Sequence, residues 1–380
     1  MRTIEKNTRI NAEHGVICAF PKDFFGYFAW PSVARDAAGT LFVGASGLRN
    51  RHVGPFGRVV FMRSTDEGNT WTTPRVIHDS PLDDRDTGVV CYPDGRRIVV
   101  SWFTLDMKRY MARRKKADTI DDKTSALIER GLGWITDEGV ALSFGSWTKT
   151  SENGGITWSD SARSPVTSPH GPVLLKNGKL LYFGKQFPTD PDALPAGGGG
   201  IQAVESTDFG KSWTELGTVP LCADTVEQNY HEPHIVELEN GRLVGLIRVQ
   251  NFGDEKIGNP NVPHFSLVQT VSDDGGRTFS RAEPLGFHGS PAHIVRHSNG
   301  VLVSVYGYRE KPYGERVALS RDGGETWEYN QILRDDGPDG DLGYPASVEL
   351  DDGSIFTIYY QKPSSVDDKC GLMWSRWRLP

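Results

Sequence analysis

Six segments of the chain begin or end with side chains that bind charged groups or transfer protons. The residues near the start of each segment are Trp30, Asp86, His170, Glu232, His293 and Tyr344. The residues at the ends of the strands that follow are Arg49, Arg51, His52, Lys185, Arg248, Tyr306, Arg309 and Gln361. If the fold gathers these acids, imidazoles, phenol and cations, they form a polar pocket that accepts an anion. We therefore expect such a pocket.

The six segments share one pattern, which is a strand, a turn ending in glycine, and an apolar strand. Apolar, β-branched and aromatic runs joined by NG, DG or AG are hairpin signals. The copies are WPSVARDAAGTLFVG, DTGVVCYPDGRRIVVSW, PHGPVLLKNGKLLYFG, EPHIVELENGRLVGLIR, SPAHIVRHSNGVLVSVYG and YPASVELDDGSIFTIYY.

A second pattern, Ser-x-Asp-x-Gly-x-Thr-Trp, alternates with the first and occurs five times. The copies are STDEGNTW, SENGGITW, STDFGKSW, SDDGGRTF and SRDGGETW. The Asp or Asn side chain accepts backbone N–H groups within a turn, and the glycine adopts a φ that a Cβ would resist. Each copy is therefore predicted to join two antiparallel strands.

Six units of four strands predict an all-β fold, a six-bladed β-propeller that forms one domain over residues 1–380. The last unit lacks the Asp-type turn, so we expect a strand from within residues 9–20 to complete it and close the ring. The innermost strands of a propeller converge, which brings together the residues near the starts of the six segments, here called the openings. Residues 105–133 are charged and helix-like, and we place them as an insertion in the second blade, either a solvated helical cap or a lid over the site.

Composition excludes several classes of partner. The formal net charge is −7, which argues against a nucleic-acid or anionic-membrane binder. No run of about 18 apolar residues is present, so no spanning helix is expected. The N-terminus lacks an apolar signal region, so a cytoplasmic location is the default and a processed secreted form stays an alternative. The oligomeric state is not determined by the sequence.

The five turns and six blades resemble the Asp-box repeats of the sialidase (neuraminidase) superfamily over nearly the whole chain. In that family the turns lie at the periphery, so they indicate the fold and not the activity. The resemblance implies that Tyr344, in GYPASVELDDG, is the nucleophile, and that Glu232 is its partner. Arg248 follows Glu232 by the family's offset. Arg309 fits another substrate-binding arginine, and Arg316 fits it less well.

These roles are chemically consistent. A tyrosine hydroxyl has a pKa near 10 and needs an adjacent base to attack at neutral pH. A neutral nucleophile avoids repulsion by a carboxylate on the anomeric carbon, and arginines bind that carboxylate through paired N–H donors. The resemblance thus implies an exo-acting, retaining glycoside hydrolase for a terminal acidic sugar, with a carbohydrate as its partner.

The sequence departs from the family at two places. The family's first arginine lies in a Tyr-Arg-Ile-Pro stretch at the opening of the first blade, whereas this chain has no arginine from Gly26 to Ala34. The loop GLRNRHVGPFG has no acid where the family has its acid/base aspartate. Arg49 or Arg51 is a candidate replacement for the arginine. His52 and Asp86, or Asp84 in place of Asp86, are candidate proton donors. Trp30, His170 and His293 are candidate substrate contacts.

Three alternatives follow from these departures. One is a glycosidase for a non-sialic sugar with other acid/base residues or an inverting mechanism. Another is a non-catalytic carbohydrate-binding propeller, and the third is a protein-interaction propeller. His170, His234 and His293 do not form a metal-binding motif, and the four cysteines contain no CxxC. We predict neither a metal site nor a cofactor.

Overall fold

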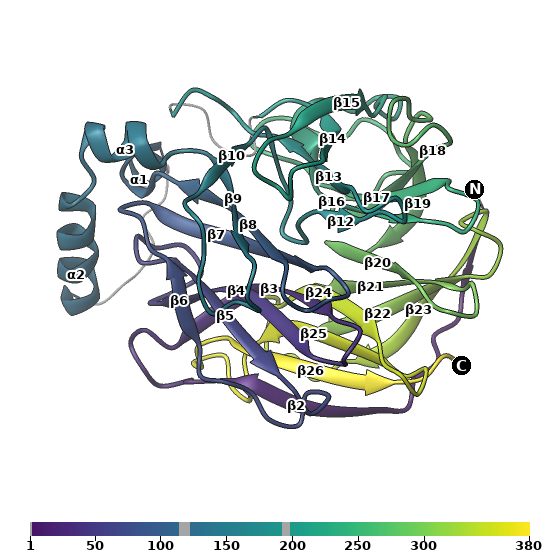
Figure 1. The fold of residues 1–380 in the computed structure, drawn as a ribbon, viewed down its shortest axis with the longest axis horizontal. Coiled ribbons are helices and arrows are strands. Elements are labelled where there is room, and N and C mark those ends of the chain that lie inside the picture. Colours follow the sequence, from purple (N-terminus) through teal and green to yellow (C-terminus); the bar gives the residue numbers. More distant parts are fainter. Residues whose placement is uncertain (1, 114–121, 192–197) are drawn as a thin grey trace.

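Six antiparallel sheets surround one axis in a computed structural model that describes residues 2–113, 122–191 and 198–380 (Figure 1). The predicted six-bladed β-propeller is confirmed. The strands of the first two blades are β3 (Tyr27–Arg35), β4 (Leu41–Arg49), β5 (Arg58–Ser64) and β6 (Arg75–His78), then β7 (Asp83–Cys91), β8 (Ile98–Leu105), β9 (Ser146–Ser151) and β10 (Ala162–Ser164). Those of the third and fourth are β11 (Val166–Thr167), β12 (Val173–Leu174), β13 (Leu180–Gln186), β14 (Ile201–Ser206) and β15 (Thr214–Thr218), then β16 (Tyr230–Glu237), β17 (Leu243–Val249), β18 (Ser266–Ser272) and β19 (Glu283–His288). Those of the fifth and sixth are β20 (Ala292–Arg296), β21 (Leu302–Tyr308), β22 (Gly314–Ser320) and β23 (Thr326–Arg334), then β24 (Gly343–Glu349), β25 (Ile355–Gln361) and β26 (Gly371–Trp377).

The N-terminal segment supplies the outer strand of the last blade. β2 (Ala12–Cys18) pairs antiparallel with β26, so strands from the two ends of the chain share one sheet. The preceding β1 (Arg2–Glu5) adds a parallel fifth strand to β23 of the fifth blade, which the repeat pattern did not predict. Both contacts cover strands that would otherwise be exposed edges.

Each Asp-type turn joins the third and fourth strands of its blade, as the pattern predicts. In the fifth blade, Asp322 Oδ1 accepts hydrogen bonds from the Ser320 hydroxyl at 2.8 Å and the Thr326 backbone N–H at 2.9 Å. Its Oδ2 accepts the Thr326 hydroxyl at 2.7 Å. The carboxylate thus satisfies the polar groups of the turn. It stabilises the hairpin and lies away from the starts of the blades, so its role is structural.

The helical insertion lies in the second blade, between β8 and β9. It contains α1 (Met107–Arg113), α2 (Asp122–Gly133) and α3 (Asp137–Ser143), which form a separate lobe at one side of the propeller (Figure 1). This confirms the predicted position of the helical segment, although residues 114–121 of it lie outside the described part of the chain. No helix among the described residues is both long and apolar enough to cross a membrane.

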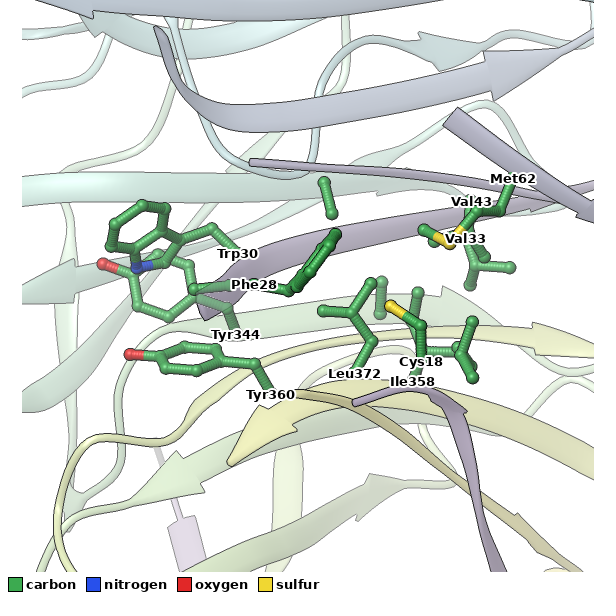
Figure 2. Close-up of a cluster of buried hydrophobic side chains, with 14 of the residues drawn as sticks. Cys18, Phe28, Trp30, Val33, Val43, Met62, Tyr344, Ile358, Tyr360 and Leu372 are labelled. Carbon is green, nitrogen blue, oxygen red and sulfur yellow. The ribbon is translucent and has the colours of Figure 1, made fainter. Parts of the chain in front are cut away.

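Apolar side chains fill the spaces between neighbouring blades. Between the first and last blades, Phe28, Val43, Ile358 and Leu372 are buried with Trp30 and other apolar residues (Figure 2). This layer joins the first blade to the last, and the rings of Trp30, Tyr344 and Tyr360 belong to it.

The inner strand of the third blade is interrupted. Its two short pieces, β11 and β12, both pair with β13, and Gly171 lies between them at a φ of 74°. A Cβ at Gly171 would lie 2.9 Å from the Cα of Gly88 on β7 of the second blade, so the two backbones approach too closely for side chains. The second and third blades therefore meet here through their backbones.

Candidate active site

Four of the predicted openings share an unusual backbone conformation. Trp30, Asp86, Glu232 and Tyr344 have φ values of 51°, 55°, 45° and 52°, in the left-handed region that non-glycine residues rarely adopt. Each lies at a register shift between the first and second strands of its blade. A bulge of this kind redirects a side chain, and strained residues of this kind cluster at functional sites.

The bulges bring Tyr344, Glu232 and Arg248 together. The Tyr344 hydroxyl donates a hydrogen bond to Glu232 Oε1 at 2.5 Å. Arg248 Nη1 donates to the Tyr344 oxygen at 3.0 Å and forms a salt bridge with Glu232 Oε2. Burial raises the pKa of Tyr344 far above its usual value, and the Glu232 carboxylate raises it further. Tyr344 therefore carries its proton in this arrangement.

Two aromatic rings pack beside the ring of Tyr344 in this group. The Tyr344 ring centre lies 6.4 Å from that of Trp30 and 5.9 Å from that of Tyr360. Figure 2 shows these three rings side by side with their polar ends on the same side. Arg309 lies against this layer, 5.5 Å from the Tyr344 ring centre, and donates two hydrogen bonds to the Leu342 carbonyl. Arg316 instead binds backbone carbonyls within the fifth blade.

Arg85 supplies a guanidinium group above Trp30. Its central carbon lies 4.0 Å from the Trp30 ring centre, and its Nη1 donates to Asp83 Oδ2 at 3.1 Å. Arg49, a predicted replacement cation, is fully buried and forms two hydrogen bonds with the Asp83 carboxylate. A Cβ at Gly57 would lie 2.1 Å from Arg49 Nη1, so the loop fits around this pair. Arg49 therefore positions Asp83, and Arg85 faces the cavity.

His52 forms a hydrogen-bonded network with Asp341 and Tyr27. Its Nδ1 lies 2.8 Å from Asp341 Oδ1 and 2.9 Å from the Tyr27 hydroxyl, which also donates to the carboxylate. Although burial works in the opposite direction, the hydrogen bond from His52 holds the pKa of Asp341 well below its usual value. The carboxylate thus accepts the Nδ1 proton and leaves Nε2 of His52 for a ligand.

Asp86 is a carboxyl group in a poorly solvated position. Its Oδ1 is buried and has no hydrogen-bond partner among the described residues. Burial raises the pKa of Asp86 to about 7, against the effect of Arg85 and with a further increase from Glu232. Asp84 is fully buried and accepts hydrogen bonds from Ser80, at 2.8 Å from the backbone N–H. Of the two predicted acids, Asp86 is therefore the one that lines the cavity.

Four of these residues, His52, Arg85, Asp86 and Glu232, line a cavity of about 270 Å³ at one end of the propeller axis. Its polar part contains His52, Arg85, Asp86, Lys185, His231 and Glu232. Its apolar part contains Val53, Phe103, Leu105, Tyr110 and Phe252. Tyr344 is only 6% exposed and does not itself line this cavity, but its hydroxyl is hydrogen-bonded to Glu232, which does. Arg309 lines a separate, smaller cavity of about 140 Å³ with Phe265 and His264.

Two predicted substrate contacts lie elsewhere. His170 and His293 line a cavity of about 380 Å³ that is formed by the later parts of the inner strands, at the other end of the axis. They pack with His234, whose ring is stacked on that of His293 at 4.0 Å. The structure therefore does not bring His170 and His293 to the cavity of Glu232. Arg51 is also absent from the residues that line this cavity.

The histidine cluster does not form a metal site. Nδ1 of His234 and Nδ1 of His293 each accept a backbone N–H of the next blade, at 3.2 Å. The two rings are nearly parallel, at 18°, so their remaining nitrogens do not converge on one ion. In the described ranges, no group of three or more His, Cys, Asp or Glu side chains is suitable for binding a metal ion.

Three residues of the cavity and its surroundings were not selected from the sequence. Arg85 lies in the acidic run that contains Asp86, where an arginine is most simply a partner of the neighbouring acids. Asp341 precedes Tyr344 by three residues in a turn-like segment, where an acid is usually a turn residue. Tyr110 carries no signal beyond its place in the insertion. Only the packed structure places these three around one site.

Comparison with known proteins supports the fold. Residues 135–357 match the family of BNR repeat-like domains. A protein of unknown function from Dyadobacter fermentans is 21% identical, with a TM-score of 0.72, and the match covers 98% of this chain and 100% of that one. The NanB sialidase from Streptococcus pneumoniae is 12% identical, with a TM-score of 0.64 and coverage of 96% and 70%. The intramolecular trans-sialidase from Ruminococcus gnavus is 14% identical, with a TM-score of 0.59 and coverage of 96% and 97%.

A search of curated protein sequences finds no match. At these identities, the solved structures establish a shared fold and no more. The family match, however, extends over more than half of the chain and coincides with four of the five Asp-type turns. The chain is therefore a member of the BNR repeat-like domain family, and it shares its propeller fold with the NanB sialidase and the trans-sialidase compared above.

Proposed function

We propose that the protein is an exo-acting, retaining glycoside hydrolase that removes a terminal acidic sugar. The observation that supports this most directly is the 2.5 Å hydrogen bond from the Tyr344 hydroxyl to Glu232, beside Arg248. A phenol attacks at neutral pH only if a base accepts its proton, and Glu232 is placed to do so. Tyrosine nucleophiles are a recognised exception to the use of two carboxylates in glycosidases.

In this proposal the substrate carboxylate separates Arg248 from Glu232. Without a substrate, Arg248 is paired with Glu232. A substrate carboxylate competes for the same guanidinium group, which frees Glu232 to accept the Tyr344 proton. Arg85 adds a second cation at the cavity, and Arg309 adds a third beside the Tyr344 ring. Binding of an acidic sugar thus activates the nucleophile.

Asp86 is the proton donor in this mechanism. With a pKa of about 7, its carboxyl is largely protonated below neutral pH and can protonate the leaving oxygen. Tyr344 Oη forms a bond to the anomeric carbon as the bond to the leaving oxygen breaks. Asp86 then accepts a proton from water, which attacks the same carbon as the bond to Tyr344 Oη breaks, and Glu232 returns its proton to the Tyr344 oxygen. Two displacements at one carbon retain its configuration. His52, held by Asp341, binds a sugar hydroxyl.

The proposal is tested with 4-methylumbelliferyl glycosides of N-acetylneuraminic acid, other keto-acid sugars, a uronic acid and a neutral hexose. We expect release of the fluorophore from an acidic glycoside and the retained anomer as the first product by NMR. Tyr344→Phe should lower kcat at least about 10³-fold. Unchanged turnover in this variant would remove Tyr344 from the mechanism. Binding of these sugars without turnover would instead support a carbohydrate-binding propeller.

A further inference from the structure

The apolar side of the cavity comes mainly from one blade and its insertion. Phe103 and Leu105 lie on β8, and the register pairs them with Arg85 and Asp83 of β7. Tyr110 lies on α1, which begins two residues after β8 ends. The blade that supplies Asp86 therefore also supplies an apolar wall beside it.

The insertion is packed against the propeller. Leu105 and Met107 are buried with Ile135, Val140 and Phe144 of the insertion, and Tyr110 packs against this cluster. Asp106 caps the start of α1, since its Oδ1 accepts the Arg109 backbone N–H at 3.1 Å. These contacts hold Tyr110 in place at the cavity wall.

The insertion also supports the loop that carries His52. Gly131 of α2 lies against Pro55 and Phe56, and a Cβ at this glycine would lie 2.8 Å from the Phe56 ring. Pro55 and Phe56 follow His52 by three and four residues. The helical segment thus contacts the rim of the cavity at two places, and it is more than a cap exposed to solvent.

We propose that Tyr110, with Val53, Phe103 and Leu105, forms a subsite for an apolar or aromatic leaving group. This assignment rests on the proposed function for its position in the reaction. Asp86 protonates the leaving oxygen, so the group that departs must lie on the side of Asp86, which is the side of the apolar wall. Aromatic side chains bind an apolar or aromatic surface through area burial and ring contacts. The substrate is therefore an acidic sugar joined to an apolar aglycone.

The first test measures binding of 4-methylumbelliferone alone, by fluorescence titration, and requires no turnover. We expect saturable binding to the wild-type protein and binding about fivefold to tenfold weaker in Tyr110→Ala. Tyr110→Phe keeps the ring and should bind as wild type does. Trp134→Ala is the matched control, because Trp134 is an aromatic residue of the same insertion that is 66% exposed and does not line the cavity. Equal binding to Tyr110→Ala and wild type would overturn the subsite.

The second test compares methyl and octyl glycosides of the sugar that proves to be cleaved, beginning with N-acetylneuraminic acid. The two leaving alcohols have similar acidity and differ in apolar surface. We expect the wild-type enzyme to have a higher kcat/KM for the octyl glycoside, and Tyr110→Ala to lose about fivefold of this preference through KM. Equal preference in both proteins would contradict the subsite. Weakened aglycone binding in Tyr110→Ala without hydrolysis of any glycoside would reject only the proposed function.

Discussion

The guanidinium carbon of Arg85 lies 4.0 Å above the centre of the Trp30 ring. The stretch from Gly26 to Ala34, where the resemblance to sialidases implies an arginine, contains none, and the cation beside Trp30 comes instead from the neighbouring blade. The ring supports the guanidinium group through a cation–π contact, and Asp83 fixes its Nη1. A cation is thus supplied to the cavity by a different strand.

This arrangement predicts that Arg85→Gln weakens binding of acidic substrates. The loss of a charge-assisted contact should raise KM about tenfold to a hundredfold, or about 1.5–3 kcal/mol, with a smaller change in kcat. The fold should tolerate the change, because Asp83 keeps both hydrogen bonds from Arg49. Arg97→Gln, in an exposed hairpin of the same blade, is the control. A KM unchanged from wild type would show that Arg85 does not bind the substrate.

Glu232→Gln should lower kcat about 10²- to 10⁴-fold, the range for the loss of a general base. The amide still accepts a hydrogen bond from Tyr344 but cannot take its proton. The measurement is steady-state kinetics on the best acidic glycoside. Glu237→Gln, on the same strand at the other end of the axis, serves as the control and should behave as wild type. A small effect on kcat in Glu232→Gln would mean that another group activates the phenol.

The pKa of Asp86 predicts the pH dependence of the reaction. Burial raises this pKa to about 7, so the carboxyl is protonated and competent as an acid below pH 7, and it loses its proton above pH 7. We expect kcat/KM to fall about tenfold per pH unit on the alkaline side. Asp86→Asn should be slow and should lack this alkaline limb. If the limb persists in Asp86→Asn, a different group, such as His52, is the acid.

The histidine cluster at the other end of the axis predicts acid sensitivity of the fold. Burial lowers the pKa of His234 to about 3, and it lowers those of His170 and His293 well below their usual value. The unfolded chain then binds more protons than the folded one below about pH 6.5, so stability rises with pH up to that value and falls in acid. His234 alone should contribute a loss of about 2 kcal/mol between pH 7 and pH 5.

The test of this effect is urea unfolding of wild type and His234→Asn at pH 5 and pH 7. Asparagine offers an oxygen in place of Nδ1 for the Ile294 N–H. The difference in unfolding free energy between pH 7 and pH 5 should shrink by about 2 kcal/mol in the variant. The exposed His288→Gln is the control and should keep the wild-type difference. An unchanged difference in His234→Asn would show that this ring titrates normally.

The sequence by itself determined the architecture. The Asp-type turns and the glycine-ended hairpins are encoded by residues that are adjacent in the chain, and their alternation requires the six sheets, including the outer strand from the N-terminal segment. It also indicated Tyr344, Glu232 and Arg248, because equivalent positions in a repeat occupy equivalent places around the axis. The structure joins these three by hydrogen bonds.

Only the tertiary structure decided where the remaining side chains point. Trp30, Asp86, Glu232 and Tyr344 lie at bulges at the starts of their blades, whereas His170 and His293 line the cavity at the other end of the axis. Arg49 is buried in its pair with Asp83, whereas Arg85 lines the cavity and lies over the Trp30 ring. Tyr110 reaches the wall because the insertion packs beside β8. These outcomes depend on contacts between blades that are distant in sequence, which a local pattern does not encode.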